Sequence, residues 1–181
     1  YRVFQFVAMP AIAASVAMLP FAARKFGEND LHGVRRGLTQ AHIAGLVYAA
    51  AVAPILYLVA PPLARHLTAS PVTFAYLVPA LRLVPVAALA ATPFFLCRPV
   101  FEGMGRGRPG LGLSALRYGV LAAPAAWLGL AGAERLGIPG VLGLIVGLMG
   151  ASAGSSALFL AWTQRVLARR GENARNPSAA A

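Results

Sequence analysis

Three stretches of this sequence, 3–23, 41–64 and 136–164, contain no Asp, Glu, Lys or Arg. Each is long enough for a helix to cross the hydrocarbon core of a bilayer, which takes about 20 apolar residues. Only 12% of the 181 residues are charged, whereas 59% are hydrophobic. This charged fraction is about half that of an ordinary soluble domain and leaves too little polar surface to coat a water-soluble globule. The chain is therefore predicted to fold within a membrane.

Two further spans follow from the segments that separate these stretches. The segment 24–36 is the most charged internal one and is interpreted as a loop, and 102–110 holds four glycines and a proline, a composition that excludes a regular helix. The spans on either side of 102–110 contain Arg82 and Arg117 near or within their apolar runs. The five predicted spans are 3–23, 41–64, 72–98, 113–133 and 140–164.

These spans predict an all-α, polytopic bundle of transmembrane helices over 1–164, followed by a polar tail over 165–181. The loops after the first and third spans and the tail are rich in Arg and Lys, whereas the other two loops carry one arginine each, Arg65 and Arg135. Cytoplasmic loops of membrane proteins carry the excess of Lys and Arg. The tail is therefore predicted to be cytoplasmic and Tyr1 to lie outside. Because the sequence starts at a Tyr almost inside a span, an N-terminally incomplete chain is expected.

The formal net charge of +11 does not indicate a nucleic-acid partner. Fifteen of the 16 basic residues are Arg, and they lie between or at the ends of the apolar runs. A nucleic-acid-binding protein gathers its basic residues on one solvated face, together with base-reading or stacking groups. The charge is therefore interpreted as a signal of membrane topology.

The sequence also offers no constellation for catalysis or for a metal or other cofactor. The three histidines fall on different loops or span ends, and the lone Cys97 has no partner for a disulfide or a thiolate metal site. A membrane enzyme needs activated groups held together at one depth. The chain is predicted not to be an enzyme. All of the acids lie in predicted loops or in the tail: Glu28, Asp30, Glu102, Glu134 and Glu172.

Polar groups inside the spans are the candidates for a transport pathway. Arg82 is interpreted as the one ionisable residue at membrane depth, facing either a wet cavity or, by snorkelling, the outer headgroups. Pro79 and Pro85 each leave a nearby carbonyl without its helical donor, and Arg82 can satisfy such carbonyls instead. Pro85 is counted with Arg82 among the candidates for the pathway. Gln5 suits a hydrogen bond between helices or, alternatively, a contact with a ligand.

The last span carries a stripe of small residues. Two pairs of glycines are spaced four residues apart, Gly143 with Gly147 and Gly150 with Gly154. Such spacing puts a flat face on a helix and lets another helix approach closely. Helix packing is the preferred interpretation of these four glycines, and contact with a ligand is the alternative.

Three stretches together resemble the multidrug and toxic compound extrusion (MATE) family, particularly its DinF-like branch. They are Arg2 to Pro10 with its continuation over 23–29, the segment 98–109 and the segment 116–124. Members of this family have twelve helices in two lobes of six, with both termini in the cytoplasm. The resemblance implies that the five spans correspond to helices eight to twelve. It also implies that an N-terminal lobe is missing, and it gives the same orientation as the loop arginines.

The chain also departs from the family pattern. Many relatives carry Gly-Gln and Gly-Ala in the loop after the eighth helix, where Ala23-Arg24 and Gly27-Glu28 stand here, and some carry an acid where Phe4 stands. Phe4 is therefore a further pathway candidate. Relatives that bind sodium in this lobe use carboxylates on the seventh and tenth helices, and the span that corresponds to the tenth contains no acid. Any ion coupling is expected to depend on the missing lobe.

The function implied is a secondary antiporter in the bacterial inner membrane. It would export amphipathic or cationic small molecules in exchange for H⁺ or Na⁺, by alternating access between two lobes. Two alternatives remain open. One is a flippase of lipid-linked oligosaccharides from the same superfamily, which Arg82 favours because a pyrophosphate needs a cationic cavity, and the other is a membrane assembly subunit that transports nothing.

Overall fold

The computed structural model describes residues 2–105 and 107–175, and every regular element in this part of the chain is a helix. Five continuous helical segments are long and apolar enough to cross a membrane, which confirms the predicted number of spans and the all-α fold class. The fourth of them is built from three consecutive elements. In chain order the elements are α1 (Arg2–Gly27), α2 (Leu31–Leu67), α3 (Pro71–Gly103), α4 (Arg108–Ala115), the π-helical segment η1 (Leu116–Leu121), α5 (Ala122–Leu136) and α6 (Gly140–Arg175).

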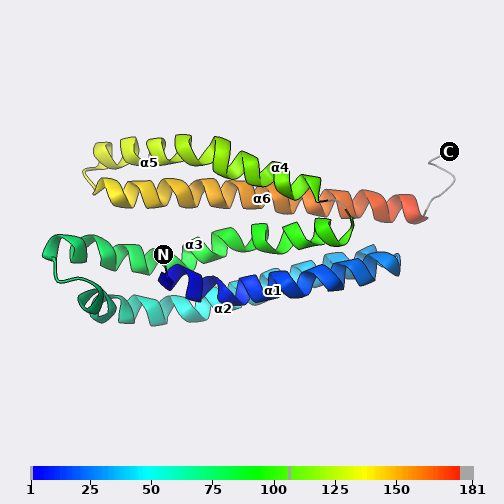
Figure 1. Cartoon of the computed structure of the whole chain (residues 1–181), viewed down its shortest axis with the longest axis horizontal. Coiled ribbons are helices and arrows are strands. Elements are labelled where there is room, and N and C mark those ends of the chain that lie inside the picture. The colour runs from blue at the N-terminus through cyan, green and yellow to red at the C-terminus, as the bar shows by residue number, and fades with distance from the viewer. Residues whose placement is uncertain (1, 106, 176–181) are drawn as a thin grey trace.

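Helix α3 is the centre of the bundle. It packs against α1 and α2 on one side and against α6 on the other, while α5 pairs with α6 (Figure 1). The main core lies where these helices meet, around Leu38, Leu96, Phe101 and Phe159, all with side chains 2% exposed or less. Many large apolar side chains on the outer faces are exposed, as expected for helices whose outer solvent is lipid.

The segment 24–36, predicted as a loop, is mostly helical. Helix α1 continues to Gly27 and α2 begins at Leu31, so only three residues connect them. The α2 N-terminus is capped by Asp30, whose carboxylate accepts a hydrogen bond from the Gly33 amide at 2.8 Å. A side-chain cap of this kind satisfies a donor that the helix itself leaves free, and it lets the charged sequence continue as helix.

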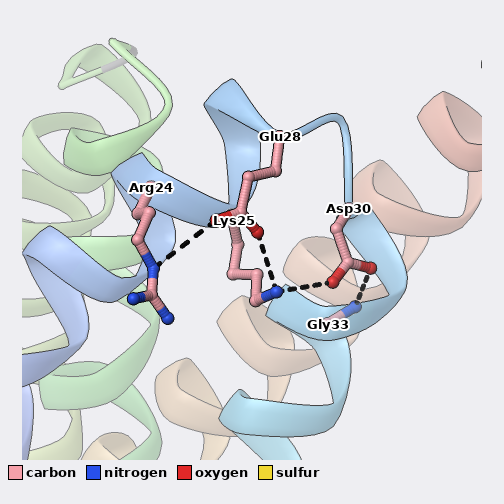
Figure 2. Close-up of polar contacts among 5 residues, drawn as sticks. All are labelled: Arg24, Lys25, Glu28, Asp30 and Gly33. Atoms are coloured by element: carbon pink, nitrogen blue, oxygen red, sulfur yellow. Dashed lines mark hydrogen bonds and ion pairs between the residues drawn. The ribbon is translucent and has the colours of Figure 1, made fainter.

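Ion pairs hold this short connection together (Figure 2). Lys25 Nζ lies 2.8 Å from Glu28 Oε2 and 3.0 Å from Asp30 Oδ2, and Arg24 Nε lies 3.7 Å from Glu28 Oε1. The amide of Gly33 and, second, the ammonium of Lys25 lower the pKa of Asp30 below its ordinary value, because both stabilise the carboxylate. The charges that suggested an irregular loop instead tie two helix ends together.

The Gly- and Pro-rich segment 102–110 was also predicted to be wholly non-helical, and this is too broad. Helix α3 runs to Gly103, and α4 starts at Arg108 with Pro109 in its first turn, where the missing N–H costs no helical hydrogen bond. The break is confined to the residues between them. Within it Gly105 has φ +71°, a left-handed conformation that glycine adopts without strain.

Helix α6 extends past the predicted end of the last span at 164. The segment from Gly140 to Ala168 is long and apolar enough to cross a membrane, and the helix continues to Arg175. The division of the chain into a bundle and a polar tail from 165 stays a prediction, and residues 176–181 of that tail lie outside the described residues.

Candidate functional site

A cavity of about 520 Å³ lies near the start of α1, between α1, α3 and the end of α2, with one residue from α6. Ligand pockets in proteins usually measure about 300–1,000 Å³, so this cavity is large enough for a small organic molecule. Its lining is apolar apart from Arg2. Residues that represent each contributing helix are Phe4, Leu67, Leu81, Val84 and Ile145.

Of the four predicted pathway residues, Phe4 lines this cavity. Gln5, its neighbour on α1, is exposed, and Pro85 is among the fully buried side chains of α3. Arg82 is not part of the lining although Leu81 and Leu83 are. The structure thus brings Phe4 to the cavity and places the other three on different faces, and their roles in transport stay predictions.

Arg82 packs on α2 instead. Its guanidinium carbon lies 4.0 Å from the centre of the Tyr57 ring, a distance typical of a cation–π interaction. Its Nε is buried without a hydrogen-bond partner, so the carbonyls freed by the neighbouring prolines do not accept from that atom. This geometry favours a structural role, in which Arg82 joins α2 to α3.

A double-mutant cycle on the complete protein tests this role. In Arg82→Gln and Tyr57→Leu we expect each single change to lower the free energy of unfolding and the pair to show a coupling energy of about 1 kcal/mol. Thermal unfolding of the purified protein measures it. A pathway role would instead leave stability unchanged and alter the preference between cationic and anionic substrates.

Two smaller cavities also border α3. One of about 150 Å³ lies between α1, α2 and α3 and is too small for a drug-sized ligand. The other, of about 300 Å³, lies between α1, α3 and the α4–η1 rod, beside an ion pair in which Arg98 Nε donates to Glu102 Oε1 at 2.8 Å. Within the described residues no group of three or more His, Cys, Asp or Glu side chains is placed to hold a metal ion.

Sequence reasoning missed Arg117. Arg117 was placed in the first turns of the predicted span 113–133 and counted as a charge that flanks the preceding loop, but Arg82 alone was interpreted as an ionisable residue at membrane depth. The structure corrects this interpretation, because Arg117 is only 8% exposed within the transmembrane rod 108–136. Its Nη2 donates to Ser152 Oγ of α6 at 2.8 Å, and its guanidinium lies 4.8 Å from the centre of the Phe94 ring. The available signal was its position inside the predicted span 113–133.

The glycines of α6 fall into two groups. A Cβ atom at Gly143 would meet the Gly129 carbonyl oxygen and the Ala133 side chain, and one at Gly147 would meet the Ala125 carbonyl oxygen. These two positions therefore lie directly against the α5 backbone. At Gly150 and Gly154 an added Cβ would have no neighbour within 4 Å. A role in helix packing for all four glycines stays a prediction, because Gly150 and Gly154 face open space in this structure.

Comparison with known proteins identifies the family of this chain. The MatE family model matches residues 1–128. No curated protein sequence matches the chain. A multidrug resistance MATE family transporter of the MOP superfamily, in an inward-facing conformation, shares 19% identity over 94% of this chain and 39% of its own, with a TM-score of 0.83.

Crystal structures of MATE in two other conformations are also similar in fold. The straight conformation shares 20% identity over 94% of this chain with a TM-score of 0.83, and the bent conformation shares 19% over 95% with a TM-score of 0.79. The chain spans 37% of each of those chains, less than two fifths of their length. Because the family model covers well over half of the sequence, this chain belongs to the MatE family.

Proposed function

We propose that this chain is part of a secondary transporter that exports amphipathic or cationic small molecules in exchange for H⁺ or Na⁺. The observation that carries the proposal is the family match over residues 1–128, together with the similarity in fold to a multidrug resistance transporter. Alternating access requires a second lobe against which this bundle rocks. A longer protein supplies that lobe, in keeping with the partial coverage of the solved transporters.

The large cavity suits the proposed cargo. Its apolar walls favour an amphipathic molecule, and Phe4 offers an aromatic face, to which cations are attracted. We place the protein in the DinF-like branch and in the bacterial inner membrane with a cytoplasmic C-terminus, on the strength of the sequence resemblance and the loop arginines. No contact of Arg82 in this structure favours the flippase, because Arg82 packs on Tyr57 rather than in the cavity.

Export of a fluorescent organic cation from proteoliposomes, driven by an imposed pH or Na⁺ gradient, tests the proposal. We expect the complete protein to transport and the 181 residues alone not to. In the complete protein, Phe4→Ala removes an aromatic wall of the cavity and should raise KM about tenfold, the equivalent of roughly 1.4 kcal/mol of lost apolar contact.

Phe6→Ala is the matched control, since Phe6 lies on the same helix with 72% of its surface exposed and does not line the cavity. Equal effects of the two changes would reject the cavity as the site of binding. Gradient-independent movement of a polyprenyl-phosphate lipid without cation export would favour the flippase, and the absence of any transport would favour an assembly subunit.

A further inference from the structure

Arg117 is a buried cation whose hydrogen bonding is incomplete. Its Nη2 donates a hydrogen bond to Ser152 Oγ, but its Nη1 is buried and has no hydrogen-bond partner. A guanidinium keeps its charge at every physiological pH and can only donate hydrogen bonds. A buried charge without a partner is costly, and in a transmembrane segment it marks a functional site.

No acid among the described residues compensates this charge. The ion pairs in the described part of the chain lie near helix ends and involve Arg24, Lys25 and Arg98, not Arg117. The rings of Phe94 and Tyr118 lie 4.8 and 5.3 Å from the Arg117 guanidinium carbon and stabilise the cation in part. Ring faces do not replace an acceptor at Nη1. What is missing is a group that accepts hydrogen bonds.

A second buried donor without a hydrogen-bond partner lies on α6, the helix that carries Ser152. Ser156 is one turn after Ser152 on the same face of α6, is 1% exposed, and its hydroxyl has no hydrogen-bond partner. The adjacent Ser155, by contrast, donates to the Ser152 carbonyl at 3.1 Å. Phe94 links the two helices, because its ring contacts both Arg117 and Phe159, which lies on the Ser156 side of α6.

The backbone conformation and the space around Arg117 restrict which partner can bind there. Arg117 belongs to η1, and π-helical turns within α-helices are frequently found at functional sites. Neither Arg117 nor Ser156 lines any of the three cavities described above, although the rings of Phe94 and Tyr118 border the cavity of about 300 Å³. A partner for Arg117 Nη1 must therefore be small, must accept hydrogen bonds, and must be negatively charged if it is to compensate the buried cation. A halide ion and a carboxylate group both meet these conditions.

We propose that Arg117 and Ser156 form an anion-binding site between η1, α3 and α6, with Ser152 orienting the guanidinium. The ligand is one acceptor-only anionic group. It comes either from a free halide or from a carboxylate of the protein outside these 181 residues. The site is independent of the proposed cargo and of its coupling ion, so it can be tested without a transport assay.

Thermal unfolding of the complete protein in chloride and in isethionate at equal ionic strength tests the halide source. We expect Tm to rise with the logarithm of the chloride or bromide concentration once that concentration exceeds Kd, because a ligand at 100 times its Kd raises the ratio of folded to unfolded protein about 100-fold. Arg117→Gln should abolish this response. Ser156→Ala should raise the apparent Kd about tenfold, the loss of one hydrogen bond to a charged group.

Arg135→Gln is the matched control, since Arg135 is an exposed arginine at the end of the same transmembrane rod. If Arg117→Gln does not fold, Arg117→Lys keeps the charge with fewer donors and should weaken the halide response, and Ser156→Ala tests the site independently. Bromide located by anomalous scattering beside Nη1 would identify a free halide.

A structure of the complete protein distinguishes the second source. Stability that is insensitive to halide, with a carboxylate oxygen within 4 Å of Nη1, would support a carboxylate from outside these residues. Halide-insensitive stability with neither group at Nη1 would overturn the proposal.

Discussion

Replacing Gly147 by Leu is expected to remove most of the folded protein from the membrane. A Cβ atom at this position already meets the Ala125 carbonyl oxygen, and the adjacent contact is the Gly129 backbone. Backbone atoms cannot rotate away as a flexible side chain can, so α5 and α6 must separate. Overpacking usually costs about 1–3 kcal/mol, and we expect a value near or above 3 kcal/mol here. Folded abundance by size-exclusion chromatography and the unfolding temperature measure the effect.

Gly154→Leu provides the control on the same helix. An added Cβ there has no neighbour within 4 Å, and Gly154 is exposed in this bundle. We expect folded abundance within about twofold of the unchanged protein, since a substitution without such a clash usually changes stability by less than about 0.5 kcal/mol. Equal loss in both variants would mean that the second half of the stripe is also a packing surface, for a helix outside these 181 residues.

The number of helices was predictable because it depends on a length that the membrane sets. Each apolar run had to reach about 20 residues, and the charges at 24–36 and 102–110 separated one run from the next. The helix ends were less predictable because α-helices continue beyond the hydrocarbon core into the headgroups. There Asp30 caps α2, and Pro109 is tolerated in the first turn of α4. Charge and proline alone therefore made the predicted helices too short at these ends.

The candidate site was less predictable because it depends on contacts between distant residues. Arg117 and Ser152 are 35 residues apart, and neither the spacing nor the composition links them. Phe4 was singled out by comparison with relatives, and its place in the cavity depends on α3 residues around Leu81 and on Ile145 of α6. Arg82 was noted as a charge in the predicted span 72–98, but its contact with Tyr57 depends on the packing of α2 on α3.

Each introduced cysteine is expected to be labelled from one side of the bilayer only. In a Cys97→Ala background, Gly27→Cys and Gly107→Cys should react with a membrane-impermeant maleimide only from the cytoplasm. Ala69→Cys and Leu136→Cys should react only from outside. Ala69 and Leu136 are exposed, and neither glycine has a neighbour within 4 Å of an added Cβ, so these probes disturb little.

The pattern of labelling separates the fold from its orientation. Consecutive spans run in opposite directions, so positions 27 and 107 must share a side if α2 and α3 both cross the membrane. Which side they share depends on the excess of arginine and lysine around them, since cytoplasmic loops retain such charge. Labelling of Gly107→Cys and Ala69→Cys from the same side would therefore contradict the crossing of α3. Reversal of all four positions would preserve the five spans but reject the cytoplasmic C-terminus.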